Sequence, residues 1–268
     1  MIYELNHFGI VVEDLEKSLD FYQDVLGAKV VFQSVIPSSQ TDILYLQISG
    51  GMIELLHRAT PNPEEGFGAT HIAFLTDDLD ADFSRLVAAG VKPLVEPKTA
   101  GSGVGRVAFV EDPNGARVEL IERDVKMRDG VIDHPYVKSF DHFSLAVADQ
   151  DAARHFYGEL LGMDRLTVME VPATELTITY FNYGYDVLEL LYRPNPAPDT
   201  PIFAHIALRV PNVDETMAAF AKFGVEPEPG TPKVTGTGLG RMGIIRDPDG
   251  FKIELLDRVD LRDLPALG

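Results

Sequence analysis

The sequence predicts an α+β protein made of four βαβββ modules that pair into two similar domains with curved mixed sheets. The main observation is an internal repeat. A shift of 135 residues brings His7 onto His142 and Glu54 onto Glu189. A weaker shift of 64 residues inside the first half brings His7 onto His71. Each quarter of the chain is therefore one copy of the same strand and helix pattern.

The first module shows this pattern most clearly. Residues 6–12 alternate in polarity as a strand does, and Asp14 is a suitable N-cap for a helix that Gly27 ends. Gly50 and Gly51 form a hairpin signal between two apolar runs. The strands expected after the helix are residues 30–35, 43–48 and 52–57.

The remaining modules set the domain boundaries. Residues 71–75 predict a strand and residues 79–89 a helix that ends at Gly90. We expect an N-terminal domain at 1–124 with modules of about 1–66 and 67–124, followed by a linker at 125–139. The C-terminal domain is expected at 140–260, with modules of about 140–200 and 201–260 and a tail at 261–268.

Each module carries a histidine on its first strand and a glutamate inside its last apolar strand, 47 to 49 residues later. A buried carboxylate is costly unless it is paired or bound to a metal. Two imidazoles and two carboxylates suit a divalent first-row metal, and an octahedral ion would keep two positions for adjacent substrate oxygens. The predicted ligands are His7, Glu54, His71 and Glu119 in one half and His142, Glu189, His205 and Glu254 in the other.

Two pairings of the modules satisfy this ligand count. Modules of one half can face each other, or the halves can exchange modules so that His7 and Glu54 meet His205 and Glu254. The repeat does not distinguish these arrangements. Both predict up to two metal ions per chain.

Composition agrees with an enzyme that acts on a small molecule. The formal charge of −19 argues against nucleic acid and anionic membrane partners, and an oligomer is allowed but not implied. Without cysteine the chain has neither disulfides nor thiolate ligands. The first residues lack the features of a signal peptide and no long apolar span follows, so we expect a cytoplasmic location.

Several motifs resemble the vicinal oxygen chelate superfamily, which includes glyoxalase I, extradiol dioxygenases and metal-free drug-binding proteins. They are the βαβββ modules, the His-Phe-x-x-x-Val openings at His7 and His142, and the Phe-Tyr pair at Phe21 followed by Leu26 and Gly27. Asp-Pro-Asn/Asp-Gly turns also precede the last Glu-Leu of each half. The resemblance covers nearly the whole chain.

This resemblance implies a fold and a class of chemistry. The His, Glu, His, Glu quartet is similar to that of glyoxalase I, whose nickel, cobalt or zinc site stabilises an enediolate. It implies a lyase or isomerase that binds an α-hydroxycarbonyl substrate through two oxygens, with manganese and iron as further candidate ions. A glutamate would move the proton between carbons, and Glu119 and Glu254 are the expected bases.

Other positions depart from glyoxalase I. Its glutathione-binding arginine is replaced by Val11 and Ala146, so we expect an enzyme that does not depend on glutathione. Arg58 and Arg193 stand where it has asparagine, and they are candidate contacts for an anionic substrate. Two glycine-rich segments predict mobile lids, and Arg106 and Arg241 at their ends are further candidate substrate contacts.

Two alternatives remain open. An extradiol dioxygenase uses two histidines and one glutamate around Fe(II), so the fourth ligand at Glu54 or Glu189 would occupy a position that this mechanism leaves open. A metal-free binding protein is the third hypothesis. Members of that kind generally lose the ligands, whereas all eight are present here.

Overall fold

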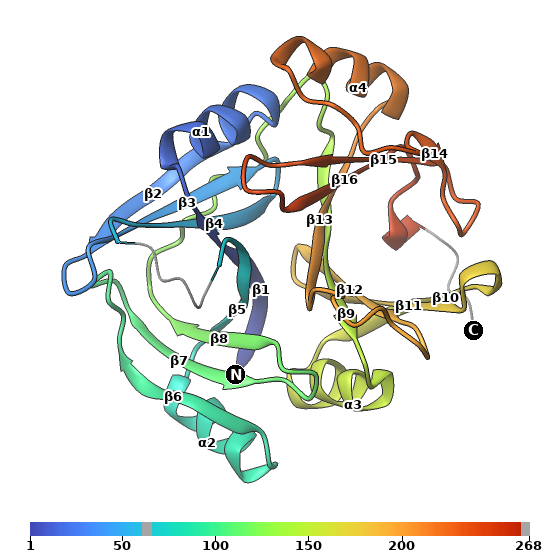
Figure 1. Cartoon of the computed structure of the whole chain (residues 1–268). Helices are drawn as coiled ribbons and strands as arrows, with labels where there is room; N and C mark the ends of the chain where they lie inside the picture. The colour runs from blue at the N-terminus through green and yellow to red at the C-terminus, as the bar shows by residue number, and fades with distance from the viewer. Residues whose placement is uncertain (61–65, 264–268) are drawn as a thin grey trace.

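A computed structural model describes residues 1–60 and 66–263 and contains two eight-stranded sheets (Figure 1). The N-terminal half consists of β1 (Ile2–Val12), α1 (Leu15–Asp20), β2 (Lys29–Ile36), β3 (Thr41–Ile48), β4 (Gly51–Arg58), β5 (Gly68–Thr76), α2 (Leu79–Ala88), β6 (Lys92–Thr99), β7 (Arg106–Glu111) and β8 (Arg117–Glu122). The C-terminal half consists of β9 (Ser139–Val147), α3 (Gln150–Arg154), β10 (Asp164–Val171), β11 (Leu176–Tyr183), β12 (Asp186–Tyr192), β13 (Phe203–Arg209), α4 (Val213–Phe220), β14 (Lys233–Val234), β15 (Arg241–Arg246) and β16 (Lys252–Leu256).

The two sheets have the same topology. Their strand orders are β2-β3-β4-β1-β5-β8-β7-β6 and β10-β11-β12-β9-β13-β16-β15-β14. Each module contributes one half of a sheet, with its first strand parallel to its last strand. The predicted α+β class and the four βαβββ modules are therefore confirmed.

The first strands of neighbouring modules join each sheet at its centre. β1 runs antiparallel to β5, and β9 runs antiparallel to β13. Modules consequently pair within each half, and the exchanged arrangement that the repeat also allowed does not occur in the described structure.

The predicted start of the first helix is confirmed by a hydrogen bond, and the third helix has an equivalent cap that was not predicted. The Asp14 carboxylate accepts from the backbone N–H of Lys17 at 3.2 Å and caps α1. Asp149 caps α3 in the same way through Asp151 and Ala152. Each of these helices continues into a π-helical segment, which is Phe21–Val25 after α1 and His155–Leu160 after α3. The sequence pattern did not predict these segments.

The halves pack on each other through an apolar centre and two reciprocal hydrogen bonds. Phe8 and Phe143, one from each central strand, lie with ring centroids 4.7 Å apart. The Tyr22 hydroxyl donates to Asp247 of the other half at 2.9 Å. Tyr157 and Asp112 form the matching bond at 3.0 Å. Each aspartate begins the turn that leads to a glutamate-bearing strand, so each half supports the turn of the other.

One edge of the molecule breaks the internal symmetry. β6 has eight residues, but its counterpart β14 has only two. Three prolines, Pro227, Pro229 and Pro232, precede β14, and proline cannot donate a hydrogen bond to a neighbouring strand. No helix of the described chain has the length and apolar character needed to span a membrane.

Candidate metal centres

Four adjacent strands bring the predicted ligands of the N-terminal half together. Gly9 on β1 lies opposite Glu54 on β4 and opposite His71 on β5. Ala73 on β5 lies opposite His7 and Glu119. Because cross-strand neighbours point to the same face of a sheet, all four ligand side chains emerge on one face.

The N-terminal centre is compact and buried. The Nε2 atoms of His7 and His71 lie 3.3 Å apart, and each lies 3.3–3.6 Å from Oε2 of Glu54 and of Glu119. All four residues are less than a tenth exposed. His7, His71 and Glu119 form a compact triad of potential ligand atoms.

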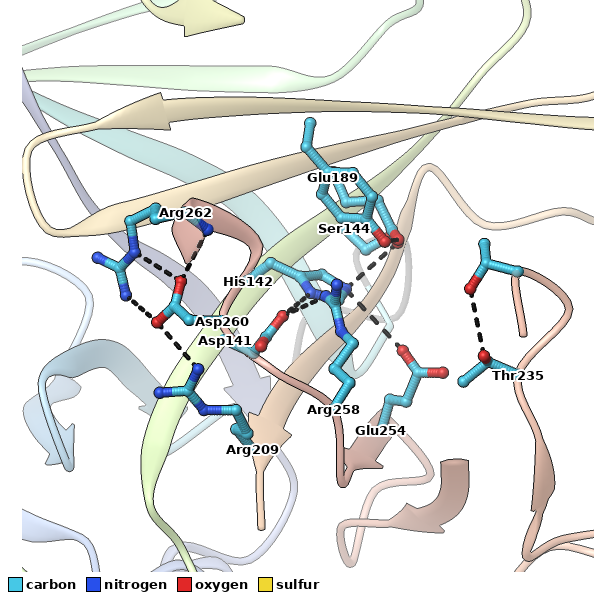
Figure 2. Close-up of polar contacts among 12 residues, drawn as sticks. Asp141, His142, Ser144, Glu189, Arg209, Thr235, Glu254, Arg258, Asp260 and Arg262 are labelled. Atoms are coloured by element: carbon cyan, nitrogen blue, oxygen red, sulfur yellow. Dashed lines mark hydrogen bonds and ion pairs between the residues drawn. The ribbon is translucent and has the colours of Figure 1, made fainter. Parts of the chain in front are cut away.

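The C-terminal centre repeats this arrangement with a more open rim. Figure 2 shows His142, Glu189 and Glu254 of this centre. His142 and His205 have Nε2 atoms 3.1 Å apart. Glu189 Oε2 lies 3.3 Å from His142 and 3.4 Å from His205, whereas Glu254 Oε2 lies 3.9 Å and 3.3 Å away. The side chains of His205 and Glu254 are 15% and 14% exposed, against 7% and 10% for His71 and Glu119. The compact triad here is His142, Glu189 and His205.

The geometry fits a divalent first-row metal at both centres. Ligand atoms about 2.1 Å from one ion lie roughly 3.0–3.4 Å apart at octahedral or tetrahedral angles. Nearly all the measured separations fall within or slightly above that range. Nitrogen and carboxylate ligands without thiolate suit manganese, iron, cobalt, nickel or zinc. A bound divalent ion would polarise a substrate carbonyl and acidify the neighbouring C–H bond.

The pKa shifts of the ligands also fit a metal-binding site. Burial raises the pKa of Glu54, but hydrogen bonds and charge from His7 and His71 lower it below its usual range overall. Burial lowers the pKa of His71, yet the two carboxylates raise it to about 9. At neutral pH a protonated imidazole thus stands between two carboxylates. A divalent ion would replace that proton, so binding should release it.

The residue before the first histidine differs between the halves. Oδ1 of Asn6 accepts from His7 Nδ1 at 3.0 Å, whereas Oδ1 of Asp141 accepts from His142 Nδ1 at 2.7 Å. Both bonds leave Nε2 facing the centre of the site. The ring of His142 gains a charged partner, which makes its free nitrogen a stronger donor to a metal. Burial lowers the pKa of His142, but Glu189 and Asp141 raise it to about 10.

An arginine supports each of these partners. Arg123 Nη2 donates to Asn6 at 2.9 Å, and Arg258 Nη2 donates to Asp141 at 2.6 Å. Asp141 and Arg258 form a buried ion pair behind His142 (Figure 2). Asn6 is neutral, so the N-terminal half has no such pair.

A second difference is the serine that contacts the first glutamate of the C-terminal half. Ser144 Oγ donates to Glu189 Oε2 at 2.6 Å, and Tyr180 Oη donates to Oε1 at 2.6 Å. Both oxygens of Glu189 are therefore held. The position equivalent to Ser144 is Gly9, where an added Cβ would lie 1.9 Å from Cε1 of His71. The missing side chain leaves room for the His71 ring.

The four predicted arginine contacts have different surroundings. Arg106 donates twice to Asp80 of α2, at 2.6 and 2.8 Å, and Arg241 pairs with Asp214 of α4 at 2.9 Å. These two arginines are engaged by surface carboxylates and tie a glycine-rich segment to a helix. Arg58 ends β4 and shares a sheet face with Glu54 four residues earlier, and Arg193 follows β12.

Sequence reasoning missed the residues that support the ligands. Asn6 and Asp141 precede the histidines directly, and this contrast was visible in the repeat alignment. Tyr180 lies on β11, opposite Glu189 on β12, so only knowledge of the strand register could have placed it.

The fold and the two ligand sets define a tandem protein with two candidate metal centres. The sequence matches the Glyoxalase/Bleomycin resistance protein/Dioxygenase superfamily at residues 4–120 and 139–255, and the chain belongs to that superfamily. It is 29% identical over 267 residues to the Probable lactoylglutathione lyase, chloroplastic, of Arabidopsis thaliana, covering 95% of this chain and 73% of that protein.

Solved structures support the fold across the whole chain. A Mn(II)-bound glyoxalase from Novosphingobium aromaticivorans superposes with a TM-score of 0.69 at 20% identity, covering 97% of this chain and 84% of that one. The halotolerant catechol dioxygenase BphC superposes with a TM-score of 0.68 at 17% identity, covering 98% and 90%. At these identities the likeness shows the fold and does not separate the two chemistries.

Proposed function

We propose that this protein is a divalent-metal isomerase or lyase of the glyoxalase type, with substrates that carry oxygens on adjacent carbons. The observation that carries the proposal is the fourth ligand. Each centre places two carboxylates beside two imidazoles, at 3.3–3.9 Å from the histidine nitrogens. One carboxylate can remain a ligand while the other carries a proton.

The proton transfer can be followed through this chain's residues. A glutamate oxygen at the centre takes a proton from the carbon that bears the hydroxyl and returns it to the adjacent carbonyl carbon. The hydroxyl proton moves to the former carbonyl oxygen, so the hydroxyl and the carbonyl exchange carbons and the reaction is a balanced isomerisation. The buried site excludes bulk water, which protects the carbanion-like intermediate from side reactions. Glu254 is our candidate base in the C-terminal half, because Glu189 is held by Ser144 and Tyr180.

The first substrate to test is the hemithioacetal of methylglyoxal and glutathione. Curated relatives such as the Arabidopsis protein carry the name lactoylglutathione lyase. They do not support our expectation of glutathione independence, which came from Val11 and Ala146. Hemithioacetals formed with smaller thiols present the same adjacent oxygens without the peptide, so comparing them decides whether glutathione is required.

The dioxygenase alternative rests on the structural neighbours named for that activity. It requires a redox-active iron and an open position for dioxygen.

The cytoplasmic location also remains a prediction, since one relative is named chloroplastic.

The test combines metal analysis with turnover. Protein purified without chelator is expected to contain close to two divalent ions per chain by mass spectrometry. It is also expected to convert a hemithioacetal after loading with nickel, cobalt, manganese or zinc. Turnover of catechol with iron alone, and none of any hemithioacetal, would reverse the order of the two hypotheses. Absence of bound metal after reconstitution would reject both.

A further inference from the structure

A cavity of about 750 Å³ lies between the two halves, apart from both metal centres. The start of β1, the β3–β4 hairpin, the linker, the β11–β12 hairpin and Arg262 line it. None of the eight predicted ligands is among its lining residues. Cavities of this volume at domain interfaces are typical of small-molecule sites.

The lining is cationic although the protein is strongly acidic. Lysine and arginine number 23 in the chain against 42 aspartates and glutamates, yet five cations and three carboxylates line the cavity. Arg128 contacts both Asp186 and Glu4, so one arginine charge is shared between two carboxylates. Arg262 is paired with Asp260 outside the cavity at 2.8 Å.

Arg123, Lys126 and Lys138 are the lining cations that none of these ion pairs engages. Arg123 bonds to the neutral Asn6, and within the described chain no carboxylate lies within 4.0 Å of Nζ of Lys126 or Lys138. Among the lining residues that the structure describes, Asp124 is the only carboxylate that Arg128 does not engage. With Asp260 counted, five cations stand against four carboxylates, and this excess of one positive charge attracts an anion.

Apolar groups complete the lining. Tyr3, Val125, Val131 and Tyr185 are between 46% and 75% exposed, and all four border the cavity. Exposed large apolar residues clustered around a hollow mark a binding site more often than scattered ones do. Phe140 forms part of the lining and packs against the β3–β4 hairpin, where an added Cβ at Gly51 would lie 2.2 Å from its Cγ.

From these features we propose that the cavity binds a small molecule with an apolar, preferably aromatic body and one acidic group. The acidic group lies near Arg123, Lys126 and Lys138, and the body contacts Tyr3, Tyr185 and the valines. A peptide or nucleic acid fits less well, because the cationic groups are few and gathered within one cavity of small-molecule size.

Ligand binding in this cavity is expected to affect only the N-terminal metal centre. Arg123 donates to Asn6, and Asn6 contacts His7. An anion that draws Arg123 away from Asn6 would loosen the support of His7. The counterpart Arg258 is not part of the lining and is buried against Asp141, so the C-terminal centre should not respond.

The test uses the full-length protein and 8-anilinonaphthalene-1-sulfonate, a fluorescent aryl sulfonate. We expect one bound probe per chain, with an affinity that falls as salt is added. Lys126→Ala with Lys138→Ala should weaken binding at least fivefold. The matched control, Lys222→Ala with Lys233→Ala, removes two exposed lysines outside the cavity and should leave the affinity unchanged.

A second variant and a neutral probe test the shape of the cavity and the need for an acidic group. Gly50 lines the cavity and an added Cβ there meets no atom within 4 Å, so Gly50→Phe should fill the space and abolish binding while metal content stays the same. N-phenyl-1-naphthylamine lacks the sulfonate and should bind more weakly. Equal affinities in the two lysine pairs, undiminished binding in Gly50→Phe, or equal binding of the neutral probe would each overturn the proposal.

Discussion

The two metal centres share four ligand types on equivalent strands but differ in what surrounds those ligands. In the C-terminal centre, Asp141 supports His142, and Ser144 fixes Glu189. In the N-terminal centre, Asn6 and Gly9 occupy the same two positions. Neighbouring residues can therefore set the properties of a centre while the ligand set stays constant. We expect the C-terminal centre to bind metal more tightly and to be more rigid.

The largest expected effect separates the two glutamates of the C-terminal centre. In a chain whose N-terminal centre is disabled by His71→Ala, Glu254→Gln should lower kcat by about 10²–10⁴, the usual range for losing a general base, while metal is retained. Glu189→Gln should instead lower metal content. Turnover and metal per chain are measured on the same preparations. Retained metal with lost turnover in Glu189→Gln would exchange the two roles.

A smaller effect on metal affinity is expected from the residue that precedes the first histidine of each half. Asp141→Asn should weaken metal binding at the C-terminal centre by about 10–100-fold, the usual cost of losing a partner of a ligating histidine. Asn6→Asp should strengthen the N-terminal centre by a similar factor. Competition with a chromophoric chelator measures both affinities. If neither substitution changes its own centre, the residue before the histidine does not account for the difference between the halves.

Gly9 and Ser144 provide a third matched pair. Gly9→Ala forces the His71 ring outward, and we expect metal binding at the N-terminal centre to weaken by about tenfold. Ser144→Ala removes one hydrogen bond from Glu189 and should weaken the C-terminal centre about fivefold, which corresponds to roughly 1 kcal/mol. The chelator titration applies again. Unchanged affinity in Gly9→Ala would mean that His71 moves outward at no cost, to the more exposed position of His205.

A separate effect, on folding stability and not on the metal centres, concerns the reciprocal turns. Burial raises the pKa of Asp247 to about 6, despite its hydrogen bond from Tyr22. A folded-state pKa above the unfolded value stabilises the protein below the unfolded pKa, near 4, and this contribution is lost as pH rises through 6. Asp247→Asn should therefore reduce the loss of stability between pH 4 and pH 7, by up to about 3 kcal/mol. Denaturant unfolding at the two pH values measures this, and equal losses in both proteins would contradict it.

The sequence predicted the modules and their order because the repeat fixes both. His7 and Glu54 have equivalents at a constant spacing, and Asp14 caps its helix as expected. It did not predict which modules pair, because the first strands of the four modules have similar apolar patterns. That choice depends on the pairing of β1 with β5, a tertiary contact that no local pattern encodes.

The site was predictable only in part for the same reason. All eight predicted ligands gather into two clusters, but their role as metal ligands remains a prediction. The surroundings of Arg106 and Arg241 could not be anticipated, since Asp80 and Asp214 reach them from helices 26 and 27 residues away along the chain. Side-chain partners of that kind depend on how a helix packs on its sheet.

The linker between the halves has an evolutionary consequence. In an assembly of two identical half-length chains, every substitution beside one metal centre would appear beside the other as well. Here the halves are parts of one chain, so Asn6 and Asp141, or Gly9 and Ser144, can diverge independently. Because the two halves belong to one chain, the metal or substrate of one centre can change while the other centre stays the same.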